Sequence, residues 1–70
     1  MIVFSTVLEI DGQPTIYSVY KNKSLAFLNP SKPVKAPILF ATYENASWTI
    51  KGTEDNSLKL QVVNEIGISD

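Results

Sequence analysis

The dipeptide Asp11-Gly12 constrains the fold more than any other feature of the sequence. It separates two runs rich in β-branched and aromatic residues, "VLEI" before it and "QPTIYSVY" after it. An Asp-Gly dipeptide between two such runs is typical of a β-hairpin closed by a two-residue turn. The turn predicts a register with the pairs Ile10–Gln13, Glu9–Pro14, Val7–Ile16 and Val3–Tyr20.

Alternation along this hairpin makes both of its faces apolar. One face carries Ile2, Phe4, Leu8, Tyr17 and Val19, and the other carries Val3, Val7, Ile16 and Tyr20. An antiparallel sheet with one face in water usually places polar residues on that face. Neither face of this hairpin follows that pattern, so neither is built wholly for contact with water.

A second hairpin is predicted in "ILFATYENASWTIKG", where Asn45-Ala46 supplies the tight turn because asparagine tolerates a left-handed φ. Tyr43 then lies opposite Trp48 in a non-hydrogen-bonded pair, where side chains approach most closely. We expect Trp48 to be the main anchor of the core rather than a stacking platform for a base or a sugar. Between the hairpins, a short strand is predicted over about 24–28, followed by a stiff proline-rich loop over 29–37.

The last third of the chain fits two periodicities. Leu58, Leu60 and Val62 alternate as in a strand, whereas Leu58, Val62 and Ile66 recur as on one side of a helix. Thr53 ahead of this run is a good helix N-cap, and Gly67 stands where a C-cap glycine belongs. These start and stop signals favour a helix over 54–66. A strand over 58–64 is the alternative.

The predicted element order is therefore β-β-β-loop-β-β-α within a single small domain, residues 1–70. The fold class is α+β: a small antiparallel sheet of four to five strands, built from two hairpins and a strand between them, with one C-terminal helix. The alternative is a small all-β barrel, in which the sheet curls until both of its faces are buried.

The composition excludes several kinds of chemistry. The chain contains no histidine, no arginine and no cysteine. Histidine-based triads, imidazole or thiolate metal sites, arginine clamps and disulfides are therefore excluded, and the sequence has no glycine-rich phosphate loop. The acidic pair Glu54-Asp55 is interpreted as the first turn of the helix rather than as a cation site. We predict no catalytic residue, no cofactor and no metal site, and thus no enzyme.

Two features bear on location. No apolar run approaches the roughly 18 residues of a membrane span. The opening segment "MIVFSTVLEI" lacks a basic region and contains Glu9, so it is interpreted as a strand rather than a signal peptide. A cytoplasmic protein without a membrane partner is expected.

The leading functional hypothesis is a non-catalytic protein-interaction module that self-associates as a homodimer or binds another protein. A helix of about 13 residues is roughly 20 Å long at 1.5 Å per residue, which is enough to cover one face of a small sheet and no more. If the helix covers the face with Phe4 and Leu8, the opposite face stays bare. The predicted interface residues are Val3, Val7, Ile16 and Tyr20.

The alternative hypothesis is binding of single-stranded nucleic acid or another anionic ligand. Residues 12–43 contain four lysines and no acidic residue, whereas residues 44–70 contain five acidic residues and two lysines. Aromatic side chains on strands with lysines around them are typical of small β domains that hold single strands. The candidate residues are Tyr17, Tyr20, Lys21, Lys23, Lys32 and Lys35. Four lysines without arginine in an acidic chain would make few phosphate contacts.

Overall fold

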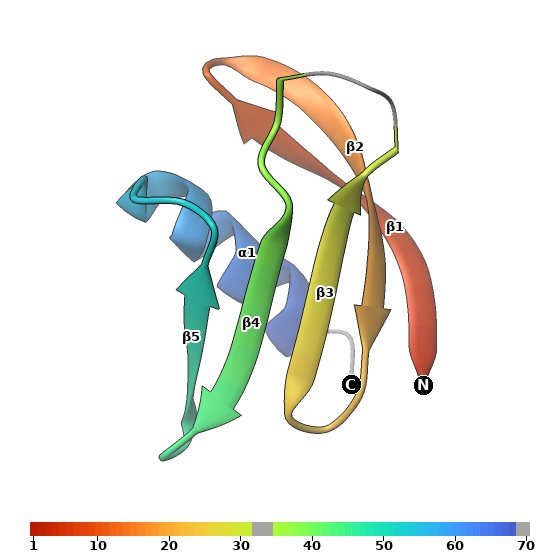
Figure 1. The fold of residues 1–70 in the computed structure, drawn as a ribbon, viewed down its shortest axis with the longest axis vertical. Helices are drawn as coiled ribbons and strands as arrows, with labels where there is room; N and C mark the ends of the chain where they lie inside the picture. The colour runs from red at the N-terminus through yellow and green to blue at the C-terminus, as the bar shows by residue number, and fades with distance from the viewer. Residues whose placement is uncertain (32–34, 69–70) are drawn as a thin grey trace.

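The computed structural model describes residues 1–31 and 35–68. Five antiparallel strands form one sheet in which every strand pairs with its neighbours along the chain, and a helix follows them (Figure 1). The elements are β1 (Ile2–Ile10), β2 (Gln13–Lys21), β3 (Leu25–Pro30), β4 (Leu39–Glu44), β5 (Ser47–Lys51) and α1 (Asn56–Ile68). The α+β prediction is confirmed. The barrel alternative is wrong, because the sheet stays open with β1 and β5 at its two edges.

The first hairpin has the predicted register. Asp11 and Gly12 form its turn with φ of 51° and 78°, both positive as in a type I′ turn. The strand pairs predicted from the two-residue turn are all present. The pairing of β2 with β3 begins only at Tyr17, so the proline at position 14 lies beyond the reach of β3 and its missing N–H leaves no gap in that ladder.

The second hairpin is confirmed as well. Asn45 and Ala46 form its turn with φ of 52° and 62°, and Tyr43 lies opposite Trp48 with the ring centroids 5.2 Å apart. The strand between the hairpins runs from Leu25 to Pro30, slightly later than the predicted 24–28. The proline-rich loop predicted over 29–37 therefore begins inside β3, and its residues 32–34 lie outside the described part of the chain.

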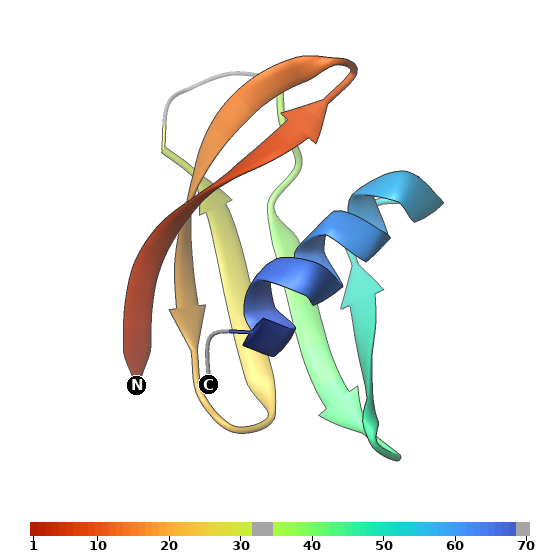
Figure 2. The same ribbon diagram turned by 180° about the vertical axis from the view of Figure 1, so that it is seen from behind.

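The helix covers one face of the sheet and crosses it obliquely from β5 to β1 (Figure 2). The stripe Leu58, Val62 and Ile66 is buried, with at most 3% of each residue exposed, so the helix prediction is confirmed and the strand alternative is wrong. Leu60 breaks the helical pattern in the sequence and is 66% exposed. The apolar stripe, rather than the propensity of its valines, therefore decides the conformation of this segment.

Both ends of the helix differ from the prediction. The helix begins at Asn56, and its N-cap is Asp55, whose Oδ1 accepts hydrogen bonds from the N–H groups of Ser57 (2.9 Å) and Leu58 (3.3 Å). Thr53 was the wrong N-cap; its hydroxyl accepts from the N–H of Asp55 (3.1 Å) and so holds the capping residue. Gly67 is not a C-cap either, because it lies within the helix.

The core fills the space between the sheet and the helix. Its largest fully buried side chains from the strands are Tyr17, Leu8, Leu28 and Leu39. Trp48 packs against this core but is only partly buried, because β5 is an edge strand. The prediction that Trp48 is the main anchor therefore needs correction: Tyr17 on the central part of β2 has that place, and its hydroxyl donates to the carbonyl of Pro37 (2.7 Å).

Candidate interaction surface

The sheet face turned away from α1, here named the outer face, is not covered by any described element. Side chains alternate along each strand, so the residues between the buried ones point away from the helix. Seven large apolar residues occupy these positions, and each is between 40% and 60% exposed. They are Val3 and Val7 on β1, Ile16 and Tyr20 on β2, Leu25 and Phe27 on β3, and Phe40 on β4.

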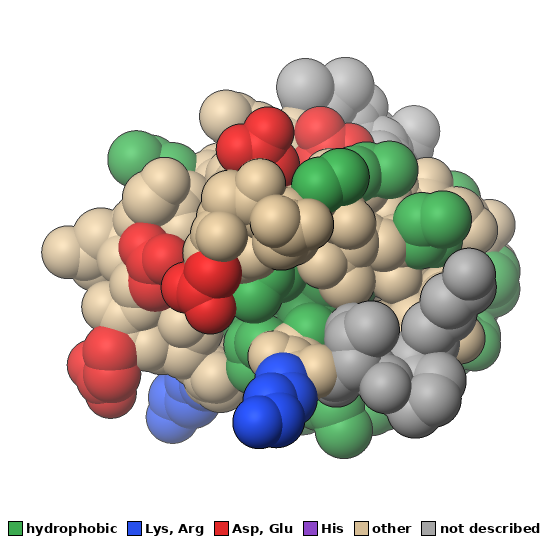
Figure 3. Space-filling view, turned by 90° about the horizontal axis from the view of Figure 1, so that it is seen from above, with side chains coloured by type: hydrophobic (Ala, Val, Ile, Leu, Met, Phe, Trp, Pro, Cys, Tyr) green, Lys and Arg blue, Asp and Glu red, His purple; other side chains and the backbone are tan. Residues whose placement is uncertain are grey.

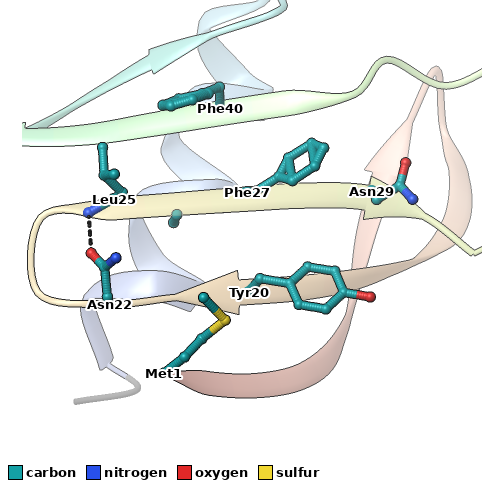
Figure 4. A pocket seen from close by; sticks show the side chains of 8 residues that line it. Met1, Tyr20, Asn22, Leu25, Phe27, Asn29 and Phe40 are labelled. Atoms are coloured by element: carbon teal, nitrogen blue, oxygen red, sulfur yellow. Dashed lines mark hydrogen bonds between the residues drawn. The ribbon is translucent and has the colours of Figure 1, made fainter.

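An aromatic row runs across the outer face at right angles to the strands. The strand registers place Val3 beside Tyr20, Tyr20 beside Phe27 and Phe27 beside Phe40, with Lys51 at the end of the row on β5. The rings of Tyr20 and Phe27 lie 6.4 Å apart between centroids with a 38° tilt. Figure 4 shows the three aromatic side chains on neighbouring strands, on the side of the sheet away from the helix.

A shallow hollow of about 700 Å³ lies over this row. Its walls are mostly apolar and include Met1, Leu25 and the three aromatic residues. The side-chain oxygen of Asn22, at its margin, accepts hydrogen bonds from the N–H groups of Ser24 (3.0 Å) and Leu25 (2.9 Å) in the β2–β3 turn. Figure 4 shows the bond to Leu25. The hollow thus offers mostly apolar contact, and no carboxylate or lysine side chain lies on its walls.

Charged residues lie around the outer face rather than within it. On the strands themselves they occupy terminal positions: Glu9 near the end of β1, Glu44 at the end of β4 and Lys51 at the end of β5. Seen from the end of the molecule that carries the β1–β2 turn, the acidic side chains lie in the left and upper parts of the view and the lysines toward its lower edge (Figure 3). Covering the middle of the outer face would therefore bury no ion, which avoids the largest desolvation cost known for protein surfaces.

The four residues predicted from the sequence as an interface, Val3, Val7, Ile16 and Tyr20, all lie on the outer face. The sequence reasoning missed Leu25, Phe27 and Phe40 as parts of the same surface. The signal that would have found the first two is the alternation in "LAFL", where Ala26 and Leu28 are buried and their neighbours are exposed.

The structure does not bring together the residues predicted for an anionic ligand. Tyr17 and Lys21 are buried beneath the helix, Tyr20 lies on the outer face, Lys23 lies in the β2–β3 turn, and Lys35 lies in the connection to β4. Lys32 lies outside the described residues. Tyr17 and Lys21 are therefore unavailable to a ligand that contacts Tyr20.

Lys21 has a structural role at the end of the helix. It is 4% exposed, its Nζ donates to the carbonyl of Ile66, and it lies 5.9 Å from the centre of the Trp48 ring. A cation at this place satisfies one of the carbonyls that a helix leaves unpaired in its last turn and complements the negative end of the helix dipole. The sequence reasoning assigned this lysine to a ligand because its burial depends on a helix that lies 45 residues away along the chain.

The described residues contain no cluster of three carboxylates that could hold a metal ion. Within the same residues, no helix is long and apolar enough to cross a bilayer. Comparison with protein-family models, with curated proteins and with solved structures finds no match to this chain.

Proposed function

We propose that the protein is a non-catalytic interaction module that self-associates by packing the outer face of one copy against the outer face of another. The observation that carries the proposal is an apolar sheet face that no described element of the chain covers. Monomeric proteins seldom expose a contiguous apolar patch of more than a few hundred Å². The cytoplasmic location expected from the sequence is part of this proposal.

The size of the face suits a protein partner. The molecule measures 31 × 23 × 17 Å, and the sheet face lies across the two longer dimensions (Figure 1). A rectangle of 31 by 23 Å has an area of about 700 Å², close to the roughly 800 Å² that each partner contributes to a standard protein interface. A contact over most of this side of the molecule would therefore approach the size of a standard interface.

A second copy suits this surface better than an unrelated partner of high charge. A two-fold dimer brings the same patch of both copies together, so a patch without charges meets another patch without charges. The aromatic row of Tyr20, Phe27 and Phe40 lies near the middle of the patch, where interface residues contribute most to affinity. The charged ends of the strands would form the polar rim.

Binding of single-stranded nucleic acid is the second candidate, and the aromatic row favours it. Bases stack on exposed aromatic side chains of small β domains. Among the described side chains, Lys51 lies on this face at the end of the row, whereas Lys21 is held beneath the helix. A single neighbouring lysine would supply little of the phosphate attraction on which such binding depends.

Analytical ultracentrifugation with a matched pair of variants tests the proposal. The wild type should sediment at no less than twice the 7.7 kDa of one chain, and Phe40→Lys should halve the mass of the assembly with an unchanged circular dichroism spectrum. Leu60→Lys is the control, because it adds the same charge at an exposed leucine of the helix, away from the outer face. A wild-type mass of 7.7 kDa at every concentration up to the millimolar range would refute self-association.

The same samples test the second candidate. Fluorescence anisotropy of a labelled single-stranded oligonucleotide at low salt should show no binding to the wild type. Saturable binding to the monomer, lost as salt is raised and lost on replacing Phe27 by serine, would favour the nucleic-acid function instead.

A further inference from the structure

The long edge strand β1 carries a row of outward-pointing backbone groups. Ile10 and Gln13 flank the two-residue turn and therefore form a hydrogen-bonded pair. The even-numbered residues of β1 consequently bond to β2, and the odd-numbered ones direct their N–H and C=O groups away from the sheet. These outward residues are Val3, Ser5, Val7 and Glu9, and β1 lies at the margin of the sheet (Figure 2).

The helix closes this edge at one place. The side-chain amide of Gln61 binds both backbone groups of Glu9: its Oε1 accepts from the N–H (2.8 Å), and its Nε2 donates to the C=O (3.1 Å). A side-chain amide with this geometry imitates the peptide group of a neighbouring strand. Among the hydrogen bonds of the described residues, none covers the outward groups of Val3, Ser5 or Val7.

The two edges of the sheet are not equally protected. β5 is only five residues long and ends in Lys51. β1 has nine residues, and its stretch from Ile2 to Leu8 contains neither a charge nor a proline. Charges, prolines and short length are the usual devices that keep edge strands from pairing with other chains. The open part of β1 has none of them.

We infer that a second copy of this chain adds its own β1 to this edge in antiparallel orientation, with Ser5 opposite Ser5. This register places Val3 opposite Val7 in both directions and gives three hydrogen-bonded pairs of two bonds each. The paired stretch ends next to Glu9, where the amide of Gln61 already occupies the edge. Valine meets valine on the outer face, and no charged residue of either strand is buried.

The edge contact leaves the outer faces free. Both it and the face packing proposed above involve a second copy, but neither contact requires the other. Edge pairing joins the two five-stranded sheets into one, with both helices on the same side. Packing two such sheets through their outer faces gives a closed assembly of four chains with two kinds of two-fold contact. Each contact has its own observable consequence.

Amide exchange measured by NMR over a range of concentrations tests the edge contact. In the monomer, the amides of Phe4 and Thr6 bond to β2 and exchange slowly, whereas those of Ser5 and Val7 point outward and exchange fast. Association through the edge should slow Ser5 and Val7 by tenfold or more, on the order expected when a solvent-exposed amide gains a partner. Fast exchange at Ser5 and Val7 at all concentrations would overturn the inference.

A mixed sample of isotope-labelled and unlabelled chains should also show a contact between the Hα of Phe4 and the Hα of Thr6 of the second copy, because these two form a non-hydrogen-bonded pair in the proposed register. Ser5→Pro removes the outward N–H while leaving the bonds to β2, and it should abolish this contact. If that variant does not fold, the amide exchange of the wild type still tests the edge contact. The loss of mass in Phe40→Lys reports the face packing alone, so each of the two contacts can be confirmed or refuted without the other.

Discussion

Replacement of Gly52 by alanine tests how the end of β5 is fitted against the chain that enters β4. Gly52 has a φ of +108°, and a Cβ built on it would lie 2.4 Å from the carbonyl oxygen of Ile38 and 3.3 Å from the Cα of Leu39. Gly12 in the first turn also has a positive φ, +78°, but no atom lies within 4 Å of a Cβ built there. The two glycines therefore separate backbone strain from steric overlap.

The structure gives different magnitudes for the two replacements. A left-handed backbone costs an L-residue roughly 1–2 kcal/mol, and this applies to both positions. At Gly52 the carbonyl of Ile38 must also move, because no Cβ tolerates an oxygen at 2.4 Å, and overpacking of this kind adds about 1–3 kcal/mol. We expect losses of about 1–2 kcal/mol for Gly12→Ala and about 2–5 kcal/mol for Gly52→Ala. A domain of this length has about 3.5–10 kcal/mol in total.

Equilibrium unfolding in urea measures both losses. The fluorescence of Trp48, the single tryptophan, and the far-ultraviolet circular dichroism should report the same single transition. The slope of the unfolding free energy against urea concentration should be the same in both variants as in the wild type. Equal losses for the two variants would show that Gly52 is needed only for its φ. A smaller loss for Gly52→Ala than for Gly12→Ala would refute the reasoning from the contact with Ile38.

Three further predictions use the same measurement. Asp55→Ala should lose about 0.5–2 kcal/mol as an N-cap replacement, and Thr53→Ala should lose less; the reverse order would reinstate Thr53 as the cap. Burial raises the pKa of Tyr17, so above pH 10 the unfolded chain releases a proton that the folded chain keeps, and the free energy of unfolding should fall as the pH rises. The fall should be less steep in Tyr17→Phe; an equally steep fall in the wild type and in this variant would contradict the prediction. Trp48→Ala should lose less than the about 3–5 kcal/mol typical of a buried tryptophan, and a loss in that range would show that it is a full core residue.

The parts of the fold that depend on neighbours in the sequence were predicted well. Asp11-Gly12 and Asn45-Ala46 set the hairpin registers through their own backbone preferences, so no distant contact was needed to find them. The buried stripe from Leu58 to Ile66 was equally readable from its spacing. The predicted start of the helix was wrong by two residues because Thr53 and Asp55 are both good N-cap residues. The conformation of the chain after β5 determines which of them caps the helix.

The candidate surface was predicted only in part for a related reason. Val3, Val7, Ile16 and Tyr20 belong to the first hairpin, where the local register determines the face of each side chain. Phe40 joins them through the pairing of β3 with β4, which are separated by a long connection without a turn signal. The partial exposure of Trp48 depends on the order of the strands in the sheet, and a single sequence does not specify which strand is at the edge.

The order of the strands also has a consequence for the way in which the chain folds. Each strand pairs only with the strand before and after it, so the sheet grows by closing the connections between consecutive strands, which costs less entropy than bringing together segments far apart in the chain. The contacts that join α1 to β1 are different, because Gln61 and Glu9 are 52 residues apart and Glu65 and Thr6 are 59 apart. Docking of the helix should thus be the late step, with mutations at Val62 speeding unfolding while hardly slowing folding. Until that step, the nascent sheet exposes two apolar faces instead of one, and its most aggregation-prone state precedes the native one.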